Sequence, residues 1–285
     1  MESLYEYLGI SRQGVHQKND RKIVEQNLHS EIHKLVTVRR ARHKKEGSRC
    51  LFYSLNIKEK FGIGVNKFES IMKSLKLTIA KKRKSITSSS RCLKSKEYTN
   101  LSNGLVINGP NQLIVGDITY VKGEKEQYYV FILTDVYHGL IVGLSIGKQM
   151  TAKVALEALE QLFKLRGEKE FPNLIHHTDG GGQYFSKIYL ARLAKAKIKV
   201  SVAGNCRENG HAERENSIVK NDYLCFLDTS SEAAAKRSCA KVKLLVNTER
   251  SQKALGYKTA ETYEKMILKM EEKDRPKKQL HNFAK

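Results

Sequence analysis

The sequence has few cysteines, five in 285 residues, and no two of them lie close together. An odd number without a close pair excludes a disulfide framework and a zinc site of the CxxC type, and is typical of a reducing cytosol. Long apolar runs are also missing, so the sequence predicts no membrane-spanning helix. Residues 1–5 lack a basic region followed by an apolar stretch, and no secretory signal is therefore expected.

Acidic residues are in deficit: 30 Asp and Glu stand against 52 Lys and Arg, which gives a net charge of +22. Such a surplus favours a nucleic acid as the partner, with an acidic membrane surface as the second choice. Hydrophobic residues still make up 40% of the chain, which excludes disorder from end to end. Residues 1–100 alone carry a net +14, so the first third is the strongest candidate for contacts with a polyanion.

The most basic segment starts a predicted linker over residues 81–108, in which serine-rich sequence follows the cations. Two readings of this segment remain open, a solvated tether and direct phosphate contact. Its candidate phosphate-binding residues are Lys81, Lys82, Arg83 and Lys84.

Before the linker, the apolar pattern is helical, and residues 1–80 are predicted to form a small helical segment. A glycine-containing turn at residues 60–64 between two short helices is typical of a helix-turn-helix. Lys67 and Lys73, on the polar side of the last helix, are candidate DNA-binding residues. The predicted helices cover Gln26–Arg42, Ser48–Leu55 and Val65–Leu75.

After the linker, the pattern predicts a catalytic core over residues 109–270 and a charged tail over residues 271–285. The order is three strands, a helix, a strand, a helix, a strand and a helix, which implies a mixed α/β (α+β) sheet of five strands flanked by helices. The predicted strands are Gln112–Val121, Tyr128–Val136, Gly139–Ile146, Leu174–His177 and Ile198–Val202. The predicted helices are Thr151–Arg166, Lys187–Ala196 and Asn209–Leu224.

Three acidic residues occupy positions that suit a catalytic carboxylate. Asp117 lies inside an apolar strand, where an acid is costly to bury unless it is paired or bound to a metal. Asp179 follows the fourth strand, and strand ends are where open α/β sheets place ligand-binding groups. Glu213 lies at the start of the last core helix. Each acid alone has an ordinary structural explanation, and the hypothesis depends on all three occurring in this order.

The sequence around these acids resembles a known family. The three blocks are Asp-Ile-Thr-Tyr at 117–120, His-Thr-Asp-Gly-Gly-Gly-Gln-Tyr at 177–184 and Glu-Asn-Gly-His-Ala-Glu-Arg-Glu-Asn at 208–216. Together they resemble the blocks of DDE transposases, and most of all the insertion-sequence transposases that share the retroviral-type integrase core. The resemblance covers roughly residues 31–265.

The resemblance implies an RNase H-like core in which Asp117, Asp179 and Glu213 hold two Mg²⁺ or Mn²⁺ ions. It also implies DNA strand cleavage and strand transfer on transposon ends and target DNA, in a homo-oligomer assembled on the DNA in the prokaryotic cytosol. An upstream-frame transposase protein is a further expected partner, and no membrane is involved. Carboxylate oxygens suit these hard cations, which agrees with the implied chemistry.

The choice of Glu213 over Glu215 depends on register. Asp179 to Glu213 leaves 33 residues, two fewer than the usual spacing of the family, whereas Glu215 leaves 35. The neighbours of Glu213 match the family block only in this register. Lys220 follows Glu213 by seven residues, two helical turns along the same face, where the family carries a DNA-contacting lysine. We therefore assign the third carboxylate to Glu213 and a DNA contact to Lys220.

The sequence departs from the family at three further positions, where Ile114, Ser251 and Ala260 replace its usual Trp, Pro and Pro. These departures are typical of a diverged copy. Two alternatives therefore stay open: an RNase H-like nuclease without strand transfer, and a DNA-binding remnant that no longer catalyses.

Overall fold

The computed structural model describes residues 7, 9, 11–80, 98–123, 126–204 and 217–280. The chain divides into two compact units, residues 1–82 and 83–285, which we describe separately.

The first unit is helical, as predicted, but its helices differ in extent from the prediction. Helix α2 (Arg12–Arg42) begins 14 residues before the predicted start at Gln26. The Ser11 side chain caps it by accepting a hydrogen bond from the Gly14 amide at 3.0 Å. Its first half contains no buried residue and no sustained apolar period, so the sequence does not mark it; the buried residues of the helix are Ile32 and Val36.

Within the described residues of this unit, three short helices follow α2. Helices α3 (Ser48–Ser54) and α5 (Val65–Ser74) lie where they were predicted, and α4 (Ile57–Phe61) is an additional helix just before the glycine-containing turn. Gly62 ends α4 in the left-handed conformation, with φ of 66°. Apolar side chains from all four helices, including Leu51 and Phe68, form one core.

The second unit is built on a five-stranded mixed sheet, which confirms the predicted fold class. The strand order is β4-β3-β2-β5-β6, with β2, β5 and β6 parallel and β3 antiparallel to both of its neighbours. The strands are β2 (Leu113–Lys122), β3 (Gln127–Asp135), β4 (Leu140–Gly147), β5 (Ile175–Thr178) and β6 (Lys199–Val202).

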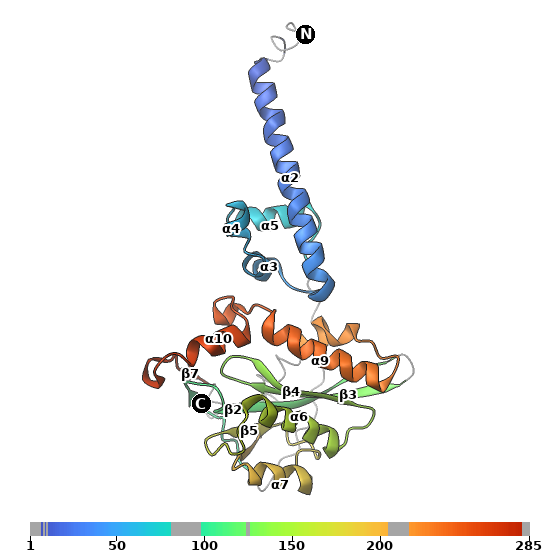
Figure 1. Cartoon of the computed structure of the whole chain (residues 1–285), viewed down its shortest axis with the longest axis vertical. Coiled ribbons are helices and arrows are strands. Elements are labelled where there is room, and N and C mark those ends of the chain that lie inside the picture. Colours follow the sequence, from blue (N-terminus) through green and yellow to red (C-terminus); the bar gives the residue numbers. More distant parts are fainter. Residues whose placement is uncertain are drawn as a thin grey trace. The chain divides into compact units, whose positions relative to one another are not determined.

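Helices cover both faces of this sheet, because its strands are apolar on both sides. Figure 1 shows α6 (Ala152–Arg166) and α7 (Lys187–Lys195) on one face and α9 (Glu232–Thr248) on the other. Helical residues 217–222 share the face of α9, because Val219 packs in the same apolar cluster. Helix α10 (Ala260–Ile267) contributes Ile267 to a third cluster at the start of β2.

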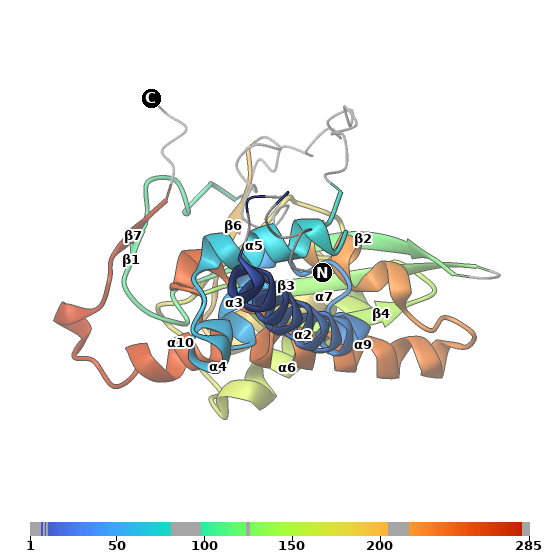
Figure 2. The same ribbon diagram turned by 90° about the horizontal axis from the view of Figure 1, so that it is seen from above.

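The ends of the second unit form a small sheet of their own. Strand β1 (Val106–Ile107) pairs antiparallel with β7 (Lys278–Gln279), and the two strands run side by side in Figure 2. The sequence placed these residues in the linker and the charged tail. The apolar side chains Ile107 and Leu280 explain the difference, because both are buried against the core.

The outer edge of β4 is closed by side chains. Asn247 of α9 accepts from the Ile141 amide and donates to the Ile141 carbonyl, both at 2.9 Å. Gln161 of α6 bonds both backbone groups of Leu144 in the same way, at 3.1 and 2.8 Å. These amides replace the hydrogen bonds of a further strand and prevent another chain from pairing there. Within the described residues, no helix is long and apolar enough to cross a membrane.

Candidate active site

Strand β2 positions Asp117 in the middle of the sheet. Successive side chains of a strand point to opposite faces, so Asp117 shares a face with Val115 and Val121. That face carries the clusters of α9, α10 and residues 217–224. The Asp117 side chain is half-buried, and its Oδ1 accepts a hydrogen bond from the Ile118 amide at 2.7 Å.

Asp179 is the first residue after β5, as the sequence predicted. Its Oδ1 accepts from the Gly181 amide at 3.1 Å, which fixes the start of the loop. Gly180 between them has φ of 83°, a conformation that side chains rarely adopt. The glycine run therefore lets the chain turn sharply away from the sheet while the carboxylate stays at the strand end.

The strand register brings the two aspartates together. Strands β2 and β5 are parallel, and Gly116 pairs with Thr178, so the next residues, Asp117 and Asp179, lie side by side on one face. Neighbouring strands are about 4.8 Å apart. The register needs a glycine before Asp117, because a Cβ at position 116 would lie 2.9 Å from Cε1 of His176.

The two histidines before Asp179 have structural partners. Burial is the largest factor that lowers the pKa of His176, to about 3, so this imidazole is neutral; Tyr189 Oη lies 2.9 Å from its Nε2. His177 lies on the same face as Asp179, and its Nδ1 is 2.8 Å from Oγ of Ser201 on β6. Both side chains are buried and tie β5 to its surroundings, next to the aspartate pair.

Tyr184, the last residue of the second sequence block, packs in the apolar cluster between the sheet and helices α6 and α7. Its ring packs edge-to-face against Phe131 and His176, with centroids 6.3 and 5.8 Å apart. Burial raises the pKa of its hydroxyl well above the ordinary value, and the negative charges of Asp117 and Asp179 add to the shift. The second sequence block contains Tyr184, but the sequence did not indicate a function for it.

The third acid of the prediction, Glu213, lies outside the described residues. Lys220 is described: its Nζ lies 4.0 Å from the ring centroid of Tyr120, a cation–π contact, and the side chain stays partly exposed. Within the described ranges, no group of three His, Cys, Asp or Glu side chains is placed to hold a metal ion.

The aspartate pair nevertheless fits a divalent cation. It supplies carboxylate oxygens from two adjacent strands on one face, which is the donor type that Mg²⁺ and Mn²⁺ prefer. Both side chains are only half-buried, so a cation can reach them from solvent. Two neighbouring carboxylates also repel each other, and a bound cation removes that repulsion.

The candidate DNA-binding residues of the first unit are partly described. Lys67 is half-exposed and forms an ion pair with Glu25 of α2 at 3.0 Å. Lys73 is exposed in the last turn of α5. The basic run at residues 81–84 lies outside the described residues.

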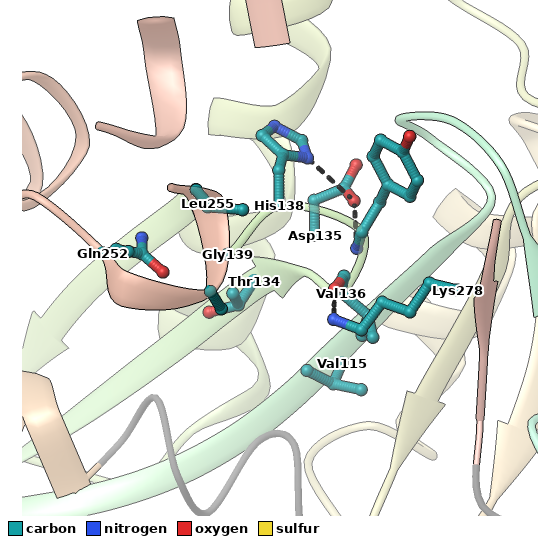
Figure 3. Close-up of a pocket in the computed structure, with 11 residues that line it drawn as sticks. Val115, Thr134, Asp135, Val136, His138, Gly139, Gln252, Leu255 and Lys278 are labelled. Atoms are coloured by element: carbon teal, nitrogen blue, oxygen red, sulfur yellow. Dashed lines mark hydrogen bonds and ion pairs between the residues drawn. The ribbon is translucent and has the colours of Figure 1, made fainter. Parts of the chain in front are cut away.

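The sequence did not predict a second polar cluster, at the end of β3 beside a cavity of about 160 Å³ lined in part by Val115 and Gln252. His138 Nδ1 lies 3.4 Å from Oδ1 of Asp135, which Figure 3 marks with a dashed line, and its Nε2 lies 3.2 Å from Oε1 of Glu264. Arg166 donates to the same Glu264 oxygen at 2.6 Å. Asp135 ends an apolar strand and Asp117 interrupts one. The sequence therefore shows an acid in each strand, but it does not indicate which of the two belongs to the candidate site and which to the ion-pair cluster.

Comparison with known proteins matches residues 107–206 to the integrase core domain family. The matched residues all lie in the second unit. The match includes Asp117, Asp179 and the whole five-stranded sheet, and it confirms the family resemblance of the first two sequence blocks; the third block, at 208–216, lies beyond the matched residues.

Two relatives outline how far the similarity extends beyond the integrase core domain. A putative transposase for insertion sequence element IS986/IS6110 of Mycobacterium tuberculosis is 37% identical over 120 residues, which cover 40% of this chain and 43% of that protein. The chain thus spans less than half of this relative. An insertion element IS600 uncharacterized 31 kDa protein of Shigella sonnei is 28% identical over 257 residues, which cover 87% of this chain and 92% of that protein.

Among solved structures, the HTLV-2 integrase catalytic core domain in complex with magnesium aligns with a TM-score of 0.44 at 24% identity. The alignment covers 55% of this chain and 97% of that one.

Proposed function

We propose that this protein is a transposase of an insertion sequence that cleaves DNA strands and transfers them to target DNA in a metal-dependent reaction. One observation carries the proposal: Asp117 and Asp179 directly follow Gly116 and Thr178, which pair between the parallel strands β2 and β5, within the residues that match the integrase core domain family. The names of the matched relatives, putative transposase and insertion element protein, point in the same direction.

Asp117 and Asp179, joined by Glu213, would hold Mg²⁺ or Mn²⁺, most simply as two ions. When bound, such ions activate the attacking oxygen and stabilise the leaving oxygen of an in-line phosphoryl displacement. In the first step a water oxygen attacks phosphorus, the bond to the 3′ oxygen breaks, and a 3′-hydroxyl is released. In the second step that hydroxyl attacks a phosphodiester of the target, whose own 3′ oxygen leaves. The three carboxylates need no covalent intermediate with the protein.

DNA is the proposed partner in both steps, as transposon ends and as target. Lys220 would meet a phosphate; its partly exposed side chain, with Nζ 4.0 Å from the ring centroid of Tyr120 on β2, supports this role. Lys67, Lys73 and the run Lys81 to Lys84 would add contacts with the backbone. A homo-oligomer on the DNA and an upstream-frame protein complete the proposed assembly, in the cytoplasm of a prokaryote.

The test uses the full chain with two DNA substrates: supercoiled plasmid, and duplexes made from the DNA on either side of the reading frame. Nicking and strand joining are measured with Mg²⁺, with Mn²⁺ and with EDTA. Asp117→Asn, Asp179→Asn and Glu213→Gln are each expected to lower the cation-dependent rates at least a hundredfold with little change in DNA affinity. Glu215→Gln is the matched control and is expected to act like the wild type.

The outcomes separate the alternatives. Nicking without joining would contradict strand transfer and indicate the nuclease. DNA binding without either reaction would indicate the remnant. An inactive Glu215→Gln beside an active Glu213→Gln would move the third carboxylate to residue 215.

A further inference from the structure

Tyr120, the last residue of the first sequence block, lies outside the apolar core of the second unit. Its side chain is 56% exposed, and it belongs to none of the apolar clusters that the described residues of this unit form. The ring instead contacts a cation, because Nζ of Lys220 lies 4.0 Å from its centroid. The contact therefore needs an explanation other than core packing.

This contact involves a stretch of β2 that has an open edge. Strand β5 pairs with β2 only as far as Gly116 and Thr178. Within the described residues, no strand pairs with β2 on this edge beyond that point. Asp117 and Asp179 are the first residues after the last pair, so the edge opens at the aspartate pair.

Lys220 approaches the ring from the other face of the sheet. The residue before it, Val219, packs in one cluster with Val121, which shares the face of Asp117. The Tyr120 side chain points to the opposite face, because side chains alternate along a strand. Strand β3 occupies the other edge of β2, so the Lys220 side chain reaches the ring past the open edge. Its ammonium group therefore lies at the edge that opens at the aspartate pair.

A ring holds a cation differently from a carboxylate. Lys148 and Lys197 pair with Glu126 and Glu170 at 2.7 and 2.6 Å, and such a partner cancels the charge that a phosphate would meet. An aromatic face attracts the ammonium group through its quadrupole and carries no net charge. Lys220 has no carboxylate partner among the described residues, so it keeps its positive charge and can still donate to a phosphate.

We propose that Tyr120 is a positioning residue for Lys220: its ring holds the ammonium group at the open edge of β2, where that group binds a DNA phosphate. This inference rests on the proposed function, in which Lys220 contacts DNA. A lysine side chain loses rotamer freedom when it binds a phosphate, and this loss weakens binding. The ring of Tyr120 restricts the side chain before DNA arrives, so less freedom is lost on binding.

The proposal assigns the role to the ring and not to the hydroxyl of Tyr120. Tyr120→Leu removes the aromatic face and is expected to weaken binding of duplex DNA about 2–5-fold, the effect of an exposed cation–π contact. Tyr120→Phe keeps the aromatic face and is expected to bind like the wild type. Lys220→Ala is expected to weaken binding and to reduce the salt slope by about one unit. When Lys220 is already alanine, Tyr120→Leu is expected to have no further effect.

The experiment has two arms, both on the full chain. Without DNA, NMR of protein labelled with ¹³C-lysine measures the Cε proton shifts of Lys220, which the Lys220→Ala variant assigns. A ring-current shift is expected in the wild type and in Tyr120→Phe, and its loss is expected in Tyr120→Leu. With duplex DNA and EDTA, fluorescence anisotropy between roughly 50 and 200 mM salt gives the affinities of the wild type, the single variants and the double variant.

The outcomes separate the role of Tyr120 from the proposed function. Tyr120→Leu binding like the wild type, or a Lys220 signal without a ring-current shift, would overturn the role of Tyr120 alone. An equal loss from Tyr120→Leu with and without Lys220 would mean that the ring itself contacts DNA, which also overturns the positioning role.

Lys220→Ala binding as tightly as the wild type would instead overturn the proposed DNA contact of Lys220, and the role of Tyr120 with it. A loss in Tyr120→Leu that disappears in the double variant supports the positioning role. A chain that shows this pattern but neither nicks nor joins DNA would contradict the proposed reaction and leave the role of Tyr120 in DNA binding supported.

Discussion

His138 is buried inside the second unit between the carboxylates of Asp135 and Glu264. Burial disfavours its protonated form, but the carboxylates of Asp135 and Glu264 outweigh burial and raise its pKa to about 9. Asp135 is fully buried, and its pKa is lowered despite burial, by His138 first and then by the Asn111 amide and Arg166. The cluster joins the end of β3 to α6 and α10 as a set of paired ions.

The pH dependence of stability follows from these directions. His138 has a pKa above its unfolded value, so its contribution is complete below about pH 6.5 and is lost as the pH rises through about 9. The free energy of unfolding of the wild type is expected to fall by on the order of 2–3 kcal/mol over this interval. Urea unfolding at a series of pH values measures it.

Two variants make this prediction specific. His138→Gln is expected to be less stable at pH 6 and to lack most of the fall toward pH 9. Glu264→Gln removes one of the two carboxylates, so the fall is expected at a lower pH. A His138→Gln variant that keeps the pH profile of the wild type would assign the dependence to other groups.

At the scale of single residues, the sequence predicts where Asp117 and Asp179 lie relative to their strands. It does not distinguish Asp117, in the candidate site, from Asp135, in the ion-pair cluster. Asp117 and Asp135 are both acids in apolar strands, yet Asp135 is fully buried among cations while Asp117 is half-exposed beside Asp179. The distinction depends on which segments pack over each strand.

The elements of the second unit show how the strand edge of β4 is protected. The amides of Asn247 and Gln161 satisfy the backbone of Ile141 and Leu144, and Lys243 donates to the Val142 carbonyl at 2.7 Å. Burial is the main cause that lowers the pKa of Lys243, to about 8. Helices α6 and α9 therefore contact this strand by hydrogen bonds as well as by apolar packing.

Substitution of Asn247 tests this edge. Asn247→Ala leaves two buried backbone groups of Ile141 unpaired and is expected to cost about 2–4 kcal/mol in the free energy of unfolding. Asn247→Asp keeps the acceptor for the amide but loses the donor to the carbonyl. Chemical denaturation combined with light scattering measures both effects, and aggregation is expected to be greater for the alanine variant. Equal stability of wild type and Asn247→Ala would contradict the role of the amide.

The elements that the sequence predicted are those with an apolar period or an apolar run. Strands β2 to β6 and helices α6 and α7 differ from their predicted bounds by one residue or so at an end. The first half of α2 was missed, since it is exposed on all sides and has no such period. Strands β1 and β7 were missed because they are two residues long and 171 residues apart, so their pairing depends on the rest of the core.

At the scale of the whole molecule, the net charge of +22 dominates any encounter with DNA. Neutralising the run Lys81, Lys82, Arg83 and Lys84 with glutamine in the full chain is expected to weaken binding to duplex DNA of any sequence. If each cation contacts one phosphate, the slope of log affinity against log salt falls by about 3–4 units. Fluorescence anisotropy between roughly 50 and 200 mM salt covers the range in which the effect is large.

A control variant removes the same amount of charge elsewhere. It replaces four exposed lysines that already form ion pairs with glutamates, namely Lys34, Lys197, Lys236 and Lys265. This control is expected to change the salt slope much less. Equal losses in the two variants would mean that the basic run acts through net charge alone, as a solvated tether.

The closed edge of β4 also has a consequence for how the protein is made. Ile141 leaves the ribosome long before Asn247, the residue that covers it, which follows 106 residues later. At translation rates of about 5–20 residues per second, the strand waits about 5–20 seconds with an uncovered edge. During that time β2, β3 and β4 can pair with each other and Gln161 can cover Leu144, but the backbone groups of Ile141 stay open to pairing with a neighbouring nascent chain. Chains that end before α9 are therefore expected to aggregate more readily than the full chain, because Asn247 never covers Ile141 in them.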